Sequence, residues 1–380
     1  MDHASGTRDG ELPPQARRRH PDAGNAPGAP AAPRPPGHRA RPSGVPSPLR
    51  RSARLWGAGF AAANVSRATA LLPPPAFENR LARFRPDVVH VVEPMLLGAA
   101  GIMWAQRLPA PIVSSFHTDL AAYCAYFQLG ALANPMWAYR RFLHNQCAVT
   151  LCPSPSTARQ VTEHDILRVG LWPRGVAAAL FTPARRSEAW RARTAGDPSR
   201  KIILYVGRLS REKNLSALTT AYRALAAPDT HLVFVGDGPG RAELEHALHG
   251  QHATFTGYLQ GETLAEAYAS SDIFAFPSLT ETFGQVVQEA MASGLPVVGF
   301  DSGGVHDLVM HEQTGLLAPA NDHVALPQAL QILLASPEQR LQLGAQGRAL
   351  AEQRTWESVM DGLLDVYATV TADRHLLRAA

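Results

Sequence analysis

Cysteine is scarce in this sequence of 380 residues, which contains only Cys124, Cys147 and Cys152. So few cysteines, odd in number, exclude a disulfide framework, and their spacing matches no metal-binding motif. We therefore expect a reducing, cytoplasmic setting in which Cys147 and Cys152 are small apolar core residues. No apolar run reaches the roughly 20 residues of a membrane-spanning helix, and no signal-peptide pattern follows the N-terminus.

Lysine is scarcer still, because only two of the 36 basic residues are lysines, Lys201 and Lys213. Ten arginines and eleven prolines fall within residues 1–55, which hold four acids and almost no large apolar side chains. Such a segment cannot offset the entropy lost on ordering, so residues 1–60 are expected to be disordered or an artefact of the gene model. The whole chain carries +4 and this segment +6, which leaves −2 for the rest, and no nucleic-acid partner is expected.

What the sequence does contain is a series of short, apolar, β-branched runs separated by helical stretches. Hydrophobic residues make up 46% of the chain and charged residues 18%, enough apolar material for a large core. Short strands that alternate with helices are typical of parallel sheets with crossover helices. The sequence therefore predicts an α/β fold of two Rossmann-like domains that face each other across a cleft. The expected strands are 87–92, 111–115, 149–152, 169–171, 202–206, 232–235, 254–256, 273–276, 296–299 and 315–317.

Two glycine turns follow expected strands in the second half. Gly207 and Arg208 come directly after strand 202–206, and Lys213 lies five residues further on. Ligands of open parallel sheets bind at the carboxyl ends of the strands, where an Arg fork and a mobile Lys suit a diphosphate. Gly236 begins a second turn that leads into a helix, whose N-terminal amides favour anions. Solvated surface charges and an ordinary tight turn are the alternatives for the two features.

A pair of carboxylates carries the sharpest signal. Glu281 lies in the loop after strand 273–276, and Glu289 lies about two turns into the helix expected over 284–293. Between them, the backbone amides of Phe283 and Gly284 are expected to be free to donate. Carboxylates accept hydrogen bonds from vicinal hydroxyls, so this pair suits two sugar rings. A helix capped by Thr280 would explain the acids but not the Phe-Gly pair.

These residues resemble the E-x7-E motif of the retaining glycosyltransferases of family 4, which have the GT-B fold. Collinear matches extend the resemblance over about residues 85–370. Three further motifs resemble the bacterial branch that glycosylates lipid acceptors, including sulfoquinovosyl-diacylglycerol synthases and related mannosyltransferases. The collinear matches are GDGP at 236–239, FTG at 255–257, SGGV at 302–305 and TGLL at 314–317, and the three further motifs are SFHTD at 115–119, LHNQ at 143–146 and LWPRGV at 171–176.

The resemblance implies a role for each matching residue on the donor side. Arg208 and Lys213 would hold the diphosphate and stabilise it as it leaves. Glu289 would bind the ribose hydroxyls, and Glu281 would grip the donor sugar. Tyr258 and Leu259 would lie beside the base. The other expected donor-binding residues are Gly207, Gly236, Phe283, Gly284 and Val286.

His117 is the candidate on the acceptor side. It follows an expected strand of the first half, and the resemblance places it under the sugar near the reaction centre. A structural histidine is the alternative. The predicted catalytic residues are thus His117, Glu281, Arg208 and Lys213. No general base is assigned, because retention in this family is thought to have the acceptor attack on the leaving-group face, with the phosphate taking the proton.

No Asp-x-Asp sequence occurs in the chain. Transferases that bridge a diphosphate with a divalent metal usually contain one, so we expect neither a catalytic metal nor any cofactor besides the UDP- or GDP-linked donor.

The family usually opens with an apolar strand and a Gly-Gly loop, which this sequence does not offer before residue 75. The expected organisation is therefore a truncated acceptor-side domain over 61–185, a linker over 186–200, a donor-binding domain over 201–360 and a C-terminal helix and tail over 361–380. The alternative to an active transferase is a catalytically impaired nucleotide-sugar-binding protein. After Gly175 and Val176 the family favours Asp, where this chain has three alanines.

The stretch 135–142 (PMWAYRRF) combines aromatic residues with Arg140 and Arg141. Aromatic residues beside cations suit a helix at a membrane interface, and a lipid or glycan acceptor with peripheral contact at the inner face of the membrane is expected. A core-packed helix with two solvated arginines is the equal alternative.

Overall fold

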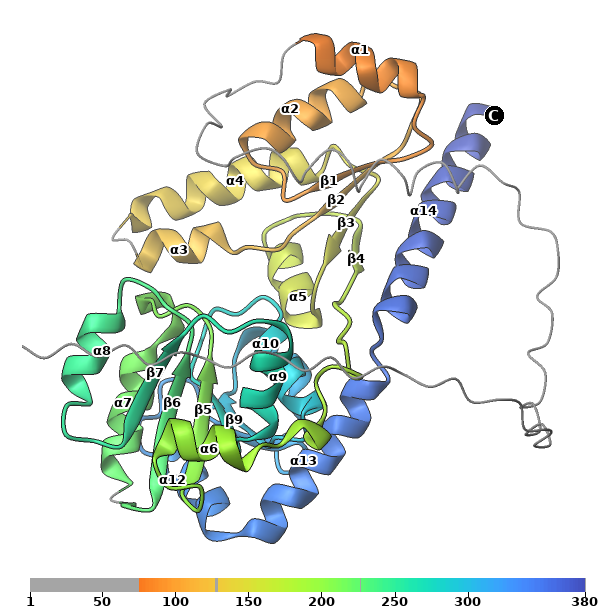
Figure 1. Ribbon diagram of the computed structural model, residues 1–380. Helices are drawn as coiled ribbons and strands as arrows, with labels where there is room; N and C mark the ends of the chain where they lie inside the picture. Colours follow the sequence, from red (N-terminus) through yellow and green to blue (C-terminus); the bar gives the residue numbers. More distant parts are fainter. Residues whose placement is uncertain (1–74, 127–128, 226, 380) are drawn as a thin grey trace, which may run out of the picture. The chain divides into compact units, whose positions relative to one another are not determined.

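The computed structural model describes residues 75–126, 129–225 and 227–379 of the chain (Figure 1). The segment 1–60, expected to be disordered or artefactual, lies outside the described residues, as does the beginning of the domain expected over 61–185.

The first half contains a four-stranded parallel sheet with the strands in chain order. All four expected strands are present, and a helix or helices connect each to the next. The strands are β1 (Val89–Val92), β2 (Ile112–Ser115), β3 (Val149–Cys152) and β4 (Val169–Leu171). The helices are α1 (Pro75–Phe84), α2 (Leu96–Ala105), α3 (Leu120–Tyr126), the 3-10 turn η3 (Gly130–Leu132), α4 (Ala133–His144) and α5 (Pro155–Glu163).

Burial in this half agrees with the apolar patterning. Cys147 and Cys152 are free thiols in the core, as expected, and burial raises the pKa of the Cys152 thiol to about 12. Ser154 caps α5, since its side chain accepts a hydrogen bond from the Thr157 amide. Within the described residues, β1 pairs with β2 alone.

Helix α4 packs into the core, but only one of its two arginines is solvated, not both. Arg140 is fully buried, whereas Arg141 is exposed and pairs with Asp165. Trp137 stacks on Phe116 with ring centroids 5.8 Å apart. The helix is therefore core-packed with one solvated arginine, because residues 137 and 140 share the inward face that residue 141 leaves.

The second half contains a six-stranded parallel sheet in the order β10-β9-β8-β5-β6-β7. The chain enters at β5, fills one side with β6 and β7, and then crosses to β8, β9 and β10 on the other side. Such a reversal of strand order marks the ligand-binding edge of a doubly wound sheet, at the carboxyl ends of the strands. The strands are β5 (Lys201–Val206), β6 (Thr230–Val235), β7 (Ala253–Gly257), β8 (Ile273–Phe276), β9 (Val297–Phe300) and β10 (Gly315–Ala318).

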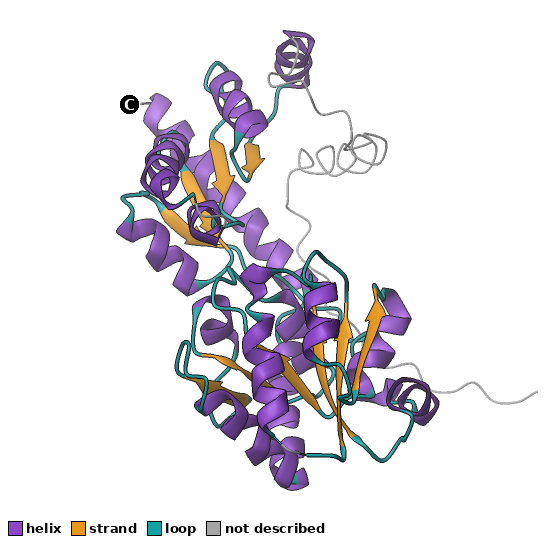
Figure 2. Ribbon diagram, turned by 90° about the vertical axis from the view of Figure 1, so that its left-hand side faces the viewer, coloured by secondary structure: helices purple, strands orange, loops and turns teal. Residues whose placement is uncertain are grey.

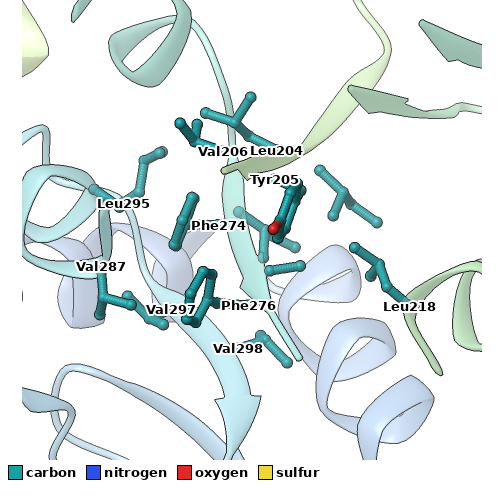
Figure 3. Packing of buried hydrophobic residues seen from close by; sticks show 14 of the residues in the cluster. Leu204, Tyr205, Val206, Leu218, Phe274, Phe276, Val287, Leu295, Val297 and Val298 are labelled. Carbon is teal, nitrogen blue, oxygen red and sulfur yellow. The ribbon is translucent and has the colours of Figure 1, made fainter. Parts of the chain in front are cut away.

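Helices lie on both faces of this sheet (Figure 2). The core beneath them is aromatic as well as aliphatic. Tyr205 stacks on Phe276, and Phe276 on Phe274, each pair with ring centroids 6.0 Å apart (Figure 3). The helical elements are η4 (Pro183–Arg185), α6 (Glu188–Ala195), η5 (Arg211–Lys213), α7 (Leu215–Ala224), α8 (Arg241–Ala247), α9 (Gly261–Ala269), α10 (Gln285–Ala292), α11 (Gly303–Leu308), α12 (Ala325–Ala335), α13 (Pro337–Glu352) and α14 (Trp356–Ala379).

The segment 186–200, expected to be a linker, contains helix α6. Ser187 caps it by accepting from the Trp190 amide, and Trp190 is buried. Arg191 is also buried, where it pairs with Asp272 and donates to the Ser270 carbonyl. Arg191 thus anchors the helix to the residues that precede β8, so this segment is packed against the second domain and is not a free linker.

The last helix, α14, packs against the first sheet although it follows the second in the chain. Leu363 forms a buried apolar cluster with Val113 of β2 and Leu151 of β3. The Tyr367 hydroxyl lies 2.7 Å from Nδ1 of His90 on β1. The expected C-terminal helix and tail is thus a structural part of the first half.

In the described part of the chain, every helix is too short or too polar to cross a bilayer.

Replacing Leu363 by alanine tests the packing of α14. We expect Leu363→Ala to lower the free energy of unfolding by about 2–4 kcal/mol, because a 9% exposed side chain is removed from the core. Leu364→Ala, at a neighbouring position that is 47% exposed, serves as the control and should change it by less than about 0.5 kcal/mol. Urea denaturation followed by circular dichroism measures both. Equal losses in the two variants would contradict the docking of α14.

Candidate active site

The two expected glycine turns touch each other at the carboxyl ends of β5 and β6. Gly236 has a φ of +127°, and a Cβ atom on it would lie 2.0 Å from the Gly207 carbonyl oxygen. Two backbone hydrogen bonds link the turns further, from the Leu209 amide to Asp237 and from the Gly240 amide to Leu209. A side chain at position 236 would separate the turns, so glycine is required there.

Lys213 reaches across this edge to Glu281. It ends η5, and Asn214 after it adopts a left-handed conformation that starts α7. The Lys213 ammonium lies 2.7 Å from the Glu281 carboxylate, and each side chain is 19% exposed. Arg208 is exposed in the same loop, beside Gly207. The structure therefore brings Lys213 and Glu281 together, although 68 residues separate them, and places Arg208 in the same loop as Lys213.

The Glu281 loop rests on the glycines that begin α11. A Cβ atom on Gly303 would lie 2.6 Å from the Glu281 carbonyl oxygen, which accepts a hydrogen bond from the Gly304 amide. Gly284 precedes α10 with a φ of +93°. Among the described residues, the amides of Phe283 and Gly284 donate to no protein acceptor. The loop thus presents two free N–H groups next to a carboxylate.

Glu289 lies one turn into α10, rather than two, because the helix begins at Gln285. Its Oε2 atom lies 3.1 Å from the hydroxyl of Tyr268, a buried residue of α9. Burial raises the pKa of Glu289 to about 7, while hydrogen bonds from Tyr268 and Gln285 act in the opposite direction. The carboxyl group is therefore only partly ionised at neutral pH.

The expected base-binding residues lie at the end of β7. Tyr258 is 70% exposed, and its hydroxyl donates to the Asp237 carbonyl. Leu259 is half-buried against the core, as is Val286 at the start of α10. Tyr258 thus stands beside the 236–240 turn.

His117 follows β2 and is bonded to the Glu281 loop. The Thr282 hydroxyl donates to the His117 carbonyl oxygen over 2.7 Å, so the residue next to Glu281 contacts His117 directly. The imidazole ring packs edge-on against Trp172, with centroids 5.6 Å apart. Burial, with the positive charges of Arg174 and Arg140 nearby, lowers the pKa of His117 to about 4. The ring is therefore neutral at physiological pH.

Several contacts to this site escaped prediction from sequence. Tyr268 supports Glu289, Thr282 joins Glu281 to His117, and Thr157 donates to the Thr282 carbonyl over 3.0 Å. Tyr123 of α3 lies in the electrostatic field of Lys213 and Glu281, while burial raises the pKa of its phenol. No sequence pattern marks these residues, because each lies in an ordinary helix or loop and acquires its partner through the tertiary fold.

The 171–176 motif lies against the junction of α13 and α14. The Val176 amide donates to the Arg354 carbonyl, and a Cβ atom on Gly175 would lie 2.5 Å from the Trp356 nitrogen. The Gln285 side chain donates to the Gly175 carbonyl over 3.1 Å. Glycine 175 therefore has a steric role that is independent of the alanines that follow Val176.

In the ranges that the structure describes, no three His, Cys, Asp or Glu side chains gather closely enough to hold a metal ion.

Comparison with known families gives matches over both halves. Residues 186–350 match the family model described as Glycosyl transferases group 1, and residues 23–180 match the one described as Glycosyltransferase Family 4. The second match begins within the arginine- and proline-rich segment.

Individual proteins are also similar. The GDP-mannose-dependent alpha-mannosyltransferase of Mycolicibacterium smegmatis is 42% identical over 310 residues, 81% of this chain and 80% of that protein. The sulfoquinovosyl transferase of Arabidopsis thaliana is 38% identical over 295 residues, 75% of this chain and 57% of that protein. Among solved structures, the sucrose-phosphate synthase of Thermosynechococcus elongatus superposes with a TM-score of 0.68 at 26% identity, covering 78% and 77% of the two chains.

The raised pKa of Glu289 predicts a pH-dependent stability difference. A carboxyl group that titrates near 7 when folded and near 4.5 when unfolded costs stability as pH rises between these values. Glu289→Gln removes this cost. At pH 8 the free energy of unfolding of the variant should exceed that of wild type by at most about 3 kcal/mol, and at pH 5 the two should be nearly equal. Urea denaturation at each pH measures the difference. Glu243→Gln, an exposed carboxylate on α8, is the control. A difference in stability between Glu289→Gln and wild type that is the same at both pH values would contradict the raised pKa of Glu289.

Proposed function

Because this chain belongs to the group 1 glycosyltransferases of family 4, retaining hexosyltransferases with the GT-B fold, we propose that it transfers a hexose to a lipid or other membrane-associated acceptor. The donor is a UDP- or GDP-linked sugar. The observation that carries the proposal is the series of contacts that joins Lys213 to Glu281, and Thr282 to His117, with Arg208 in the same loop as Lys213.

The donor diphosphate would bind Arg208 and Lys213. Both cations stand at the edge where β5 ends, and the glycine turns at 207 and 236 allow a ligand to approach the backbone closely. When the bond between the anomeric carbon and the phosphate oxygen breaks, negative charge grows on the leaving diphosphate. Preorganised cations stabilise that charge more in the transition state than in the ground state.

The sugar and the ribose would bind the two carboxylates of the E-x7-E motif. Glu281 and the free amides of Phe283 and Gly284 offer an acceptor and two donors to the hydroxyls of the donor sugar. Glu289 would accept from the ribose hydroxyls. Its neighbour Tyr268 holds the carboxyl group in place, and Tyr258 and Leu259 would meet the base.

His117 would contact the donor sugar from the acceptor side. With a pKa of about 4 it is uncharged at pH 7, so it serves as a hydrogen-bonding group and not as an acid. The acceptor hydroxyl would form its new bond to the anomeric carbon on the face that the diphosphate leaves. Its proton would pass to the departing phosphate oxygen, which yields the retained configuration.

Two exposed apolar residues at the start of α2 support a lipid acceptor. Leu96 and Leu97 begin α2, three and four residues after Glu93, and each is 60% exposed. Such side chains suit contact with an acyl chain or an interfacial surface, and the resemblance to lipid-glycosylating transferases points in the same direction.

Calorimetric titration with UDP and with GDP tests the donor site. Wild type should bind one nucleotide, and Lys213→Ala should weaken binding about tenfold to a hundredfold, as expected for a charge-assisted contact. Lys201→Ala is a matched control, because Lys201 is the other lysine of the chain and pairs with Asp229 at the opposite end of β5. Failure of the folded wild type to bind either nucleotide would overturn the proposal.

Transfer assays with GDP-mannose and with UDP-sugars, using lipid acceptors in vesicles, test the reaction. We expect an α-linked product from an α-linked donor, identified by nuclear magnetic resonance. His117→Ala should lower kcat about a hundredfold while leaving the affinity for nucleotide unchanged. Nucleotide binding without transfer to any acceptor would instead favour the impaired nucleotide-sugar-binding protein.

A further inference from the structure

An ion pair between the fully buried Arg140 and the partly buried Glu93, whose side chain is 22% exposed, contacts the loop that carries His117. Glu93 directly follows β1 and adopts a left-handed conformation with a φ of +55°. Its Oε2 atom accepts hydrogen bonds from two successive backbone amides, those of His117 and Thr118, each over 2.8 Å. Its Oε1 atom accepts from the guanidinium of Arg140. One carboxylate thus joins the end of β1, the loop after β2 and helix α4.

Arg140 completes the enclosure of the same loop. Its side chain is 0% exposed, and its second terminal nitrogen donates to the Thr118 carbonyl over 2.7 Å. The guanidinium lies over the Phe116 ring at 3.9 Å. The two charged side chains therefore contact three successive residues, Phe116, His117 and Thr118.

The far end of the loop is fastened by separate contacts. Asp119 accepts from the Ala122 amide over 2.9 Å and from the Gln160 side chain over 2.6 Å. The His117 carbonyl is occupied by Thr282. Both backbone polar groups of His117 consequently have fixed partners, so the loop sets the direction of its Cα–Cβ bond, and the contact with Trp172 then limits the orientation of the ring.

The Glu93–Arg140 ion pair is a poor means of gaining stability alone, because desolvation of its charges, complete for Arg140 and partial for Glu93, offsets their attraction. Apolar side chains of similar volume would serve a core at least as well. They could not, however, accept from two amides and donate to a carbonyl of the same loop. The geometry thus fits a role in orientation.

We propose that Glu93 and Arg140 are a positioning pair that orients His117 toward the donor sugar. This inference rests on the proposed role of His117 in transfer. The pair contacts no reacting atom and acts only through the 116–118 loop.

Kinetics of Glu93→Gln, which keeps the shape and loses the charge, test the proposal. We expect kcat to fall about tenfold to a hundredfold with unchanged affinity for nucleotide, because a loop displaced by a fraction of an ångström misplaces the imidazole. In a His117→Ala background the same substitution should cost less than about threefold, because the group it orients is gone. Losses that multiply across the two backgrounds would overturn the proposal.

Arg140→Lys is the second variant. Lysine keeps the charge, but a single ammonium cannot span Glu93 and the Thr118 carbonyl as the guanidinium fork does. It should reproduce the kcat loss with the fold intact. Arg141→Met, at the next position of α4 but on the solvent side, is the matched control and should leave kcat unchanged. Full activity in Arg140→Lys would argue against a positioning role.

Amide hydrogen exchange supplies a readout that does not need transfer activity. The amides of His117 and Thr118 should exchange slowly in wild type and at least about tenfold faster in Glu93→Gln, because a neutral amide oxygen is the weaker acceptor. Arg141→Met should leave both rates unchanged. Equal exchange rates in all three proteins would show that Glu93 does not hold these two amides, and would overturn the positioning pair itself. Failure of the proposed function would instead appear as absent nucleotide binding with the exchange pattern preserved.

Discussion

The ion pair between Lys213 and Glu281 is the contact on which the arrangement of the site depends. It ties the loop after β5 to the loop after β8, the two strands at which the order of the second sheet reverses. Thr282, the next residue, reaches the His117 carbonyl, and Gly304 donates to the Glu281 carbonyl. In the proposed mechanism, a donor phosphate that binds Lys213 would meet a cation already held in place relative to the Glu281 loop and His117, so little reorganisation would be required at that moment.

Much of this architecture could be predicted from the sequence. Short β-branched runs identified the strands correctly, and the fold class is confirmed by both sheets and by the structural match. The spacing of Glu281 and Glu289 placed one carboxylate before α10 and the other within it. These predictions succeed because parallel strands, crossover helices and glycine turns are encoded within a few residues.

What escaped prediction depends on contacts between residues far apart in the chain. Tyr268 lies 21 residues before Glu289, Tyr367 lies 277 residues after His90, and Arg140 lies 47 residues after Glu93. Arginines 140 and 141 are adjacent and chemically identical, yet one is buried and the other solvated. Only the rotation of α4 against the sheet distinguishes them, and local composition carries no information about that rotation. The same limit explains why α6 was read as a linker.

The charges in the site follow a consistent physical pattern. His117 and Glu289 are both held in conditions that favour their neutral forms, through burial that lowers one pKa and raises the other. Fixed charge is instead concentrated in Arg208, Lys213 and Glu281, where a diphosphate would accumulate negative charge. A neutral imidazole at position 117 would not compete with Arg208 and Lys213 for the phosphate. Under the proposed role of His117, orientation by the Glu93–Arg140 pair would be more useful than a charge on the imidazole, because a neutral hydrogen-bonding group contributes only where its direction is fixed.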